Sequence, residues 1–343
     1  MKRQGVENPV GMREVARRAG VSTITVSRVL SNAGNVSAQT RERVTKAVEE
    51  LGYIPNLLAR NFGLSRTPLV GVIVPTVANL MFADKIEALA EELRPHGLQL
   101  LVTHSAYSVE TEELLVEALV AQRPSGIVLT GVTHSPKTYE LLRRTGIPTV
   151  ETWNLTENPI DMVVGFSNEL AAEAMVNHLA QQGYRHIGFV HPHLNANDRA
   201  VDRLRGYRRA IKKLGLPVRP ELERASDFGF ASGAAALTDL VTNVKPLEAI
   251  FFGNDALATG GLLECRRRNI RVPEDLGIAG FDDVDLAGQL DPALTTVRVP
   301  MREIGRRTGQ VLLDRIQNPT ASAEIIDLGF EIVSRRSTRV LPQ

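Results

Sequence analysis

Two short stretches in the second half of the chain carry opposed charges that together suit a small polar ligand. The first is Arg203-Leu204-Arg205-Gly206-Tyr207, and the second is Gly253-Asn254-Asp255, which follows the apolar run AIFF. A guanidinium and a carboxylate can hold the vicinal hydroxyls or the carboxylate of a ligand through paired hydrogen bonds. Because an acidic residue directly after a strand also suits the N-cap of a helix, that alternative stays open for Asp255.

The chain lacks the sequence patterns of common catalytic sites. It contains no P-loop, no GxGxxG after a strand, no GxSxG elbow and no HExxH pair. His191 and His193 have the wrong spacing for a metal site on a helix, and the single cysteine, Cys265, has no visible activating partners and can form no internal disulfide. We therefore expect no enzyme activity, no metal and no cofactor, although an enzyme on this kind of core is the first rival interpretation.

Composition indicates a globular, modular protein. Of the 343 residues, 43% are hydrophobic and 23% are charged, close to the average of globular domains. No apolar run is long enough to span a membrane, and the polar first ten residues lack a secretory signal, which predicts a cytoplasmic protein with no membrane partner. A secreted sugar-binding protein, the second rival, would need such a signal.

Charge is divided unevenly along the chain. Residues 1–66 hold eleven Lys/Arg, five Glu and no Asp, a net charge of +6, whereas the remainder carries 29 Lys/Arg against 34 Asp/Glu, a net charge of −5. A basic terminal module on a slightly acidic body favours a polyanionic partner such as nucleic acid. A solvated charged surface is the alternative explanation.

The basic segment has the pattern of a helix-turn-helix. Residues 12–30 form two short helical patterns broken at Gly20, where glycine supplies the left-handed turn that ends a helix, and Ser22 can cap the next helix. Ala16 and Val26 have the spacing of the packing pair at a steep helix crossing. An ordinary helical hairpin is the alternative.

A third helix and a shorter fourth are predicted downstream. Ser37 opens the third, and Gly52 follows its end; its apolar face consists of Val44, Ala47, Val48 and Leu51. Pro55 then favours a helix start, and Gly63 ends a run of under two turns. So short a helix is marginal alone and should order only against a partner copy or DNA.

From residue 69 onward, apolar runs alternate with helical patterns, which is typical of parallel sheets with helical crossovers. The predicted strands are LVGVIVP, QLLVTHS, GIVLTG, PTVETW, HIGFV, AIFFGND and GIAGF. About ten strands in roughly 270 residues are more than a single open sheet usually contains. We therefore expect two doubly wound lobes, with a ligand cleft at the carboxyl ends of their strands.

The run VARRAGVSTITVSRVLSNAGNVSAQTRERVTKAVEELGYIPN resembles the headpiece of the LacI/GalR family of bacterial repressors. The resemblance implies that the helix from Ser22 lies in the major groove, that Thr23 and Ile24 read bases, and that Arg28 contacts a guanine. It places further residues on phosphates or sugars, where contacts fix register rather than sequence: Thr25, Ser27, Ser31, Asn35, Ser37, Thr40, Tyr53 and Asn56.

In the hinge helix, the resemblance places Ala59 and Phe62 in the minor groove, the second as a wedge between base pairs. The chain departs from the family twice. Phe62 stands where leucine is usual, so the wedge is bulkier. Gly11 replaces the usual threonine cap of the first helix, which weakens that terminus by up to about 1 kcal/mol.

The core resembles the periplasmic-binding-protein-like core of the same family. The expected organisation is an all-α helix-turn-helix headpiece (10–55), a hinge helix and linker (56–67) and an α/β core of two doubly wound parallel-sheet lobes (68–340). Lobe 1 should span 68–166 and 298–324, and lobe 2 should span 167–297 and 325–340, with crossings near Gly165, Val297 and Glu324. The tail to Gln343 has no leucine heptad helix, which favours a homodimer over a tetramer.

The resemblance also assigns an effector site. Arg203 matches the family's RLxG-aromatic motif, Asp255 matches its strand-terminal ND, and four residues align with cleft positions: Phe82, Thr130, Trp153 and Phe228. For Trp153 and Phe228, core packing is the alternative. The runs VPTVANLMFA, LTGVTHSPKT, VVGFSNELAA and DLGF resemble the gluconate-operon repressor branch.

That branch implies a sugar-acid effector whose carboxylate Arg203 would hold. Purine or neutral-sugar effectors stay open, as does the choice between an inducer and a co-repressor. The expected partners are double-stranded operator DNA, this small effector and a second copy of the chain.

Overall fold

The computed structural model describes residues 10–30, 34–53, 66–78 and 81–339. The chain separates into two compact units, Met1–Thr67 and Pro68–Gln343, and each is described by itself. The expected hinge helix lies outside the described residues, together with four expected DNA contacts: Ser31, Asn56, Ala59 and Phe62.

The described part of the first unit contains α1 (Met12–Ala19), α2 (Thr23–Leu30) and α3 (Ala38–Leu51). Gly20 ends α1 with φ of 64°, and the Ser22 hydroxyl accepts the N–H of Thr25 at 3.1 Å, as predicted. At the start of α1, where the family has a threonine, the Glu14 carboxylate accepts the N–H of Gly11 at 2.8 Å. One backbone donor of that terminus therefore keeps a partner without the threonine.

The three helices enclose a small core that contains the predicted pair, Ala16 and Val26. Its other buried members are Val15, Ala19, Val29, Val44, Ala47 and Tyr53. The small side chain of Ala16 lets α1 and α2 approach closely at their crossing. The outer face of α2 is thereby left toward solvent.

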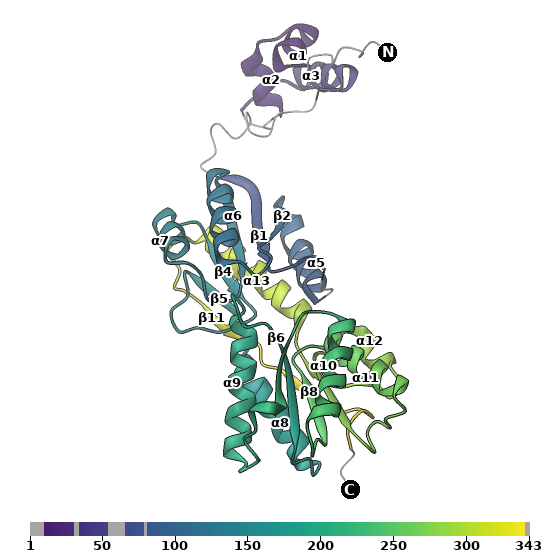
Figure 1. Ribbon diagram of the computed structural model, residues 1–343. Coiled ribbons are helices and arrows are strands. Elements are labelled where there is room, and N and C mark those ends of the chain that lie inside the picture. The colour runs from purple at the N-terminus through teal and green to yellow at the C-terminus, as the bar shows by residue number, and fades with distance from the viewer. Residues whose placement is uncertain (1–9, 31–33, 54–65, 79–80, 340–343) are drawn as a thin grey trace, which may run out of the picture. The chain divides into compact units, whose positions relative to one another are not determined.

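The second unit contains two sheets, each flanked by helices (Figure 1). Lobe 1 has the strand order β11-β5-β4-β3-β1-β2, and lobe 2 has the order β12-β10-β9-β8-β6-β7. The pairing between β10 and β12 is antiparallel, whereas the neighbouring β9–β10, β8–β9 and β6–β8 pairs are parallel. The prediction of two doubly wound lobes is confirmed.

The strands of lobe 1 are β1 (Thr67–Val74), β2 (Gln99–His104), β3 (Pro124–Thr130), β4 (Thr149–Thr152), β5 (Met162–Gly165) and β11 (Ile325–Asp327). Those of lobe 2 are β6 (Ile187–Pro192), β7 (Glu223–Ser226), β8 (Ala249–Phe252), β9 (Gly277–Asp282), β10 (Thr295–Arg298) and β12 (Glu331–Val333). The helices are α5 (Met81–Leu93), α6 (Val109–Ala121), α7 (Pro136–Thr145), α8 (Asn168–Gln181), α9 (Asp198–Lys213), α10 (Phe230–Asn243), α11 (Asp255–Arg267), α12 (Asp285–Gln289) and α13 (Met301–Gln317).

All seven predicted strands are present. Helices on both faces bury the inner strands along their length, as in β3 and β9, whereas the edge strand β2 is largely exposed. The chain passes between lobes after β5 and after β10, close to the expected Gly165 and Val297. The third crossing, expected near Glu324, comes later. Residues 325–327 still pair with β5, and the Leu328 N–H bonds to the Gly165 carbonyl at 2.8 Å. This strand is short and largely exposed, so the sequence has no long apolar run that would predict it.

Gly206 fixes the approach of α9 to α8. A Cβ at this position would lie 2.1 Å from the backbone oxygen of Glu169, so no other residue fits without moving one helix. Close contact of the two helices in turn fixes Arg203, which lies almost one turn earlier on α9. In the described part of the chain, no helix is both long and apolar enough to cross a membrane.

Candidate functional site

The outward face of α2 presents the residues expected to read DNA bases. Burial of Val26 and Val29 against α1 and α3 turns the opposite side of the helix to solvent. Thr23, Ser27 and Arg28 are exposed there. Ile24 is 64% exposed in the first turn, an unusual position for a large apolar side chain in a stable helix. An exposed polar and apolar helix face of this kind suits the floor of the major groove.

The remaining described headpiece residues divide by their local roles. Asn35 is exposed. The Ser37 hydroxyl caps α3 by accepting the Thr40 N–H at 3.3 Å, and it donates to the Thr40 hydroxyl at 2.9 Å. The Thr25 hydroxyl lies 2.9 Å from that of Ser22. Tyr53 is 7% exposed and its ring belongs to the small core, so only the edge of this residue is left for a partner.

In the second unit, Arg203 lies at the boundary of the lobes and is 6% exposed. Its Nε donates to the Asn168 side chain at 2.8 Å, and one terminal nitrogen donates to the Gly253 carbonyl at 2.6 Å. The guanidinium also lies over the ring of Phe281, 3.6 Å from its centre. Its other terminal nitrogen is 3.9 Å from Asp282 Oδ1, at the limit of an ion pair. These contacts orient the guanidinium without neutralising it.

Two buried carboxyls face this arginine and its surroundings. Burial raises the pKa of Asp282 to about 7, with the nearby Arg203 opposing the shift. Burial, reinforced by Asp282, raises the pKa of Asp255 well above its ordinary value. Asp255 Oδ1 accepts the Thr296 hydroxyl at 2.6 Å, and Oδ2 accepts the Val284 N–H at 3.0 Å. At neutral pH the buried Arg203 cation therefore lies beside two carboxyls whose pKa values are shifted toward their neutral forms.

The N-cap alternative for Asp255 is wrong. Asn254 caps α11 by accepting the Leu257 N–H at 2.9 Å, and Asp255 is the first residue of the helix. Asp255 instead borders a cavity of about 580 Å³ between the lobes. The cavity is lined by Met81 and Asp84 from α5, by Phe228 and Phe230 at the start of α10, and by residues 282–286 after β9. Phe228 is 39% exposed there, rather than packed in a core.

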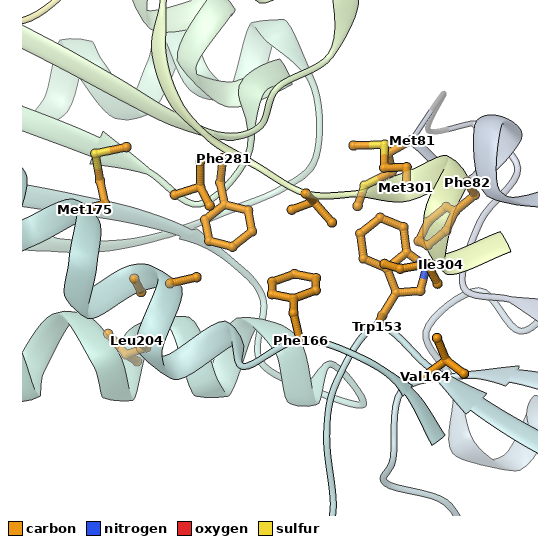
Figure 2. Packing of buried hydrophobic residues seen from close by; sticks show 14 of the residues in the cluster. Met81, Phe82, Trp153, Val164, Phe166, Met175, Leu204, Phe281, Met301 and Ile304 are labelled. Atoms are coloured by element: carbon orange, nitrogen blue, oxygen red, sulfur yellow. The ribbon is translucent and has the colours of Figure 1, made fainter. Parts of the chain in front are cut away.

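Phe82 and Trp153 lie instead in the largest apolar cluster, 2% and 0% exposed. Figure 2 shows a row of rings from Phe82 and Trp153 through Phe166 to Phe281. The Phe82–Trp153 and Phe166–Phe281 centres are 5.5 and 6.2 Å apart. Trp153 is therefore packed in the core, which was the alternative to a position in the cleft. This row joins the lobes and supports Phe281, on which Arg203 rests.

Thr130, another expected cleft residue, is 7% exposed, and its hydroxyl is occupied within lobe 1. It donates to the Ile73 carbonyl at 3.1 Å and accepts from Lys85 Nζ at 3.2 Å. Its backbone carbonyl accepts from Arg199 at 3.3 Å, across the lobe boundary. Thr130 therefore contributes mainly through its backbone.

Four polar residues of this region are not among the residues predicted from the sequence: Lys85, Tyr107, Arg199 and Asp282. Asp282 ends the run GIAGFD, so the strand-terminal rule that selected Asp255 would also have selected it. Arg199 lies four residues before Arg203 on α9 and shares its face. Tyr107 lies three residues after the last residue of β2. The positions of these three residues in the sequence therefore gave a usable signal.

Comparisons with known proteins agree with this geometry. Residues 11–56 match the family model of bacterial regulatory proteins of the lacI family, and residues 176–338 match that of the periplasmic binding protein-like domain. The HTH-type transcriptional regulator GntR of Pseudomonas aeruginosa is 36% identical over 329 residues, 95% of each chain.

Solved structures indicate the same family. A LacI-family transcriptional regulator from Silicibacter pomeroyi has a TM-score of 0.89 at 32% identity and covers 96% of this chain and 100% of its own. The lac repressor dimer bound to operator and an anti-inducer has a TM-score of 0.83 at 27% identity, covering 97% of this chain and 100% of its own. This chain belongs to the LacI family of DNA-binding transcriptional repressors, whose members act as dimers on operator DNA and respond to small effectors.

Proposed function

We propose that the effector of this repressor is a small sugar acid such as gluconate, which releases the dimer from a pseudo-palindromic operator. The observation that carries the proposal is the buried Arg203 guanidinium, whose nearest carboxylate oxygen is 3.9 Å away. A buried cation without a close counter-ion is costly, and a ligand carboxylate would supply one. The resemblance to the gluconate-operon repressor branch supports this effector class, and the carboxyls of Asp255 and Asp282 at the cavity would bind the hydroxyls of a polyhydroxylated acid.

On DNA, we propose that α2 enters the major groove, with Thr23, Ile24 and Arg28 at base edges. The hydroxyls of Ser22, Ser37 and Thr40 would lie near phosphates. Paired hinge helices would lie at the operator centre, where Phe62 would open a base step. The protein would act in the cytoplasm, on the nucleoid.

The effector would act by binding one arrangement of the lobes more tightly than the other. If that arrangement separates the hinge helices, the ligand is an inducer. A co-repressor, for example a purine or a neutral sugar, would bind the same cleft but stabilise the arrangement of the lobes that favours operator binding.

A ligand screen distinguishes these possibilities. Thermal unfolding of the full chain is measured with aldonic acids, neutral sugars and purines, and operator affinity is then measured with the best ligand. We expect stabilisation by a sugar acid and loss of operator binding. Stabilisation confined to purines or neutral sugars would refute the sugar-acid assignment. Tighter operator binding with the ligand would show that it is a co-repressor rather than an inducer.

Arg28→Ala tests the DNA assignment. We expect it to weaken binding to the intact operator by about 1–3 kcal/mol, and to lose that effect on an operator changed at the guanine it contacts. The control is Lys46→Ala on α3, which removes the same charge from an exposed position and should weaken all duplexes uniformly. Equal losses on both operators for Arg28→Ala would contradict base reading.

A further inference from the structure

The second residue of α2, Ile24, has a large apolar side chain that the headpiece does not bury. It is 64% exposed, whereas Val26 and Val29 of the same helix are 0% and 7% exposed and belong to the headpiece core. Isoleucine also loses side-chain freedom in a helix, because its branched Cβ restricts χ1. Neither core packing nor helix formation therefore accounts for an isoleucine at this position, and its apolar surface is available to a binding partner.

Ile24 shares one side of α2 with the polar residues Ser27 and Arg28. Residues three and four positions apart on a helix lie on the same face, and all three are exposed. A rise of about 1.5 Å per residue separates Ile24 and Arg28 by about 6 Å along the helix axis, which corresponds to between one and two base-pair steps of about 3.4 Å. A helix in the major groove would therefore bring these two side chains to base pairs one or two positions apart.

The chemistry of the Ile24 side chain selects the base. Isoleucine has no hydrogen-bonding atom in its side chain, whereas the major-groove edges of guanine, cytosine and adenine present donors and acceptors. An apolar side chain over those polar atoms would remove water from them without supplying a replacement hydrogen bond. Thymine differs because its 5-methyl group is an apolar surface in the same groove. Thymine is therefore the base that Ile24 fits.

We infer that Ile24 contacts the 5-methyl group of a thymine in each operator half-site, one or two base pairs from the guanine contacted by Arg28. This inference rests on the placement of α2 in the major groove proposed above, and it adds the identity of a second base. Arg28 recognises its base through paired hydrogen bonds, and Ile24 recognises its base through an apolar contact that excludes water. Together they specify a half-site in which a T·A pair lies close to a G·C pair.

Removal of single methyl groups from the operator tests the inference. The full-length protein is used to select its operator from random duplexes, and each thymine of the half-site is then replaced by deoxyuridine in both half-sites, one position at a time. Deoxyuridine keeps the base pairing of thymine and lacks only the methyl group. At one position we expect operator affinity to fall about 4-fold per half-site, or about 15-fold in all, which is the effect of one methyl-sized group that is no longer buried.

Ile24→Ala should lose this difference. Because the side chain lies outside the headpiece core, the variant should fold normally and bind the thymine and deoxyuridine operators with equal affinity. Thr45→Ala is the matched control, since it shortens another exposed, β-branched side chain, on α3, and should retain the difference of about 15-fold. Affinity for a duplex without the operator measures whether either change affects DNA binding in general.

The outcomes separate this inference from the proposed placement of α2. If deoxyuridine weakens binding at no position, or weakens it equally for the wild-type protein and Ile24→Ala, the thymine contact is wrong. A guanine preference that Arg28→Ala removes would in that case still support α2 in the major groove. If Arg28→Ala and Ile24→Ala both leave the base preferences of the protein unchanged, the placement of α2 fails and the thymine contact fails with it.

Discussion

Lys85→Met is expected to stabilise the protein, an unusual result for loss of a hydrogen-bonded side chain. Lys85 is fully buried in lobe 1 and its Nζ donates to two neutral hydroxyls, Thr130 at 3.2 Å and Thr152 at 3.1 Å. Burial, with a contribution from Arg199, lowers the pKa of Lys85 from 10.5 to about 7. A shift of this size opposes folding by on the order of 4 kcal/mol at pH 7 and below.

Methionine leaves no donor unsatisfied at this site. The Thr130 hydroxyl donates to the Ile73 carbonyl and the Thr152 hydroxyl donates to the Leu129 carbonyl at 2.7 Å, and neither bond involves Lys85. Methionine also has similar length and flexibility. Because exchange of a buried charge for an apolar side chain commonly stabilises by 1–4 kcal/mol, we expect a gain of about 2 kcal/mol in the free energy of unfolding.

The pH dependence identifies the cause. Between about pH 7 and pH 10.5, the unfolded amine holds its proton while the folded amine has released it. The unfolded state then binds more protons, so this residue makes stability rise with pH across that window. Urea unfolding at several pH values should show that the stability gained by Lys85→Met over wild type is largest at pH 7 and shrinks as the pH rises toward 10.5. The control is Lys137→Met, whose side chain is 60% exposed. A variant less stable than wild type at pH 7 would contradict the argument.

The burial of Lys85 could have been predicted from the apolar pattern of the helix that contains it. Within α5, the buried residues Met81, Phe82, Ala88 and Leu89 recur at helical spacing, and position 85 lies on the same stripe. The same periodicity and the cap residues Gly20, Ser22 and Ser37 were sufficient to predict the helices of the headpiece. Local patterns of this kind follow from backbone physics and need no tertiary information.

Side chains brought together by topology could not be found in this way. Glu112 of α6, His134 after β3 and Glu151 of β4 meet only because their elements are neighbours in lobe 1. The short strand β11 had no apolar run, so the third crossing was placed too early. The position of Trp153 at a strand end did not decide between cleft and core, because the row of rings that buries it comes from both lobes.

The three residues of that buried cluster form a carboxylate–imidazole–carboxylate bridge. His134 Nδ1 lies 2.5 Å from Glu112 Oε1, and Nε2 lies 3.4 Å from Glu151 Oε1. Glu151 also accepts the Ile160 N–H at 2.6 Å, and the ring of Tyr139 packs against the imidazole. Burial alone would lower the pKa of His134, but the two carboxylates outweigh it and raise the pKa to about 9.

His134→Gln is therefore expected to destabilise the protein by about 3–5 kcal/mol, because it leaves two buried carboxylates without their cation. The pH dependence has the opposite sign to that of Lys85. Since the folded pKa lies above the unfolded value of 6.5, the contribution of His134 is complete below about pH 6.5 and is lost as the pH rises through 9. The two slopes overlap between pH 7 and pH 9 and offset each other in the wild-type protein.

In each variant, the pH dependence of the free energy of unfolding should consequently show the contribution of the residue that remains. Relative to wild type, the free energy of unfolding should fall across pH 7–9 in Lys85→Met, which keeps the slope of His134, and rise in His134→Gln, which keeps the slope of Lys85. His178→Gln is the control, because burial lowers the pKa of this histidine and its partner, Gln182, is neutral. Urea titrations of the four proteins decide the matter: parallel pH profiles in Lys85→Met and His134→Gln would show that these two groups do not govern the stability of lobe 1.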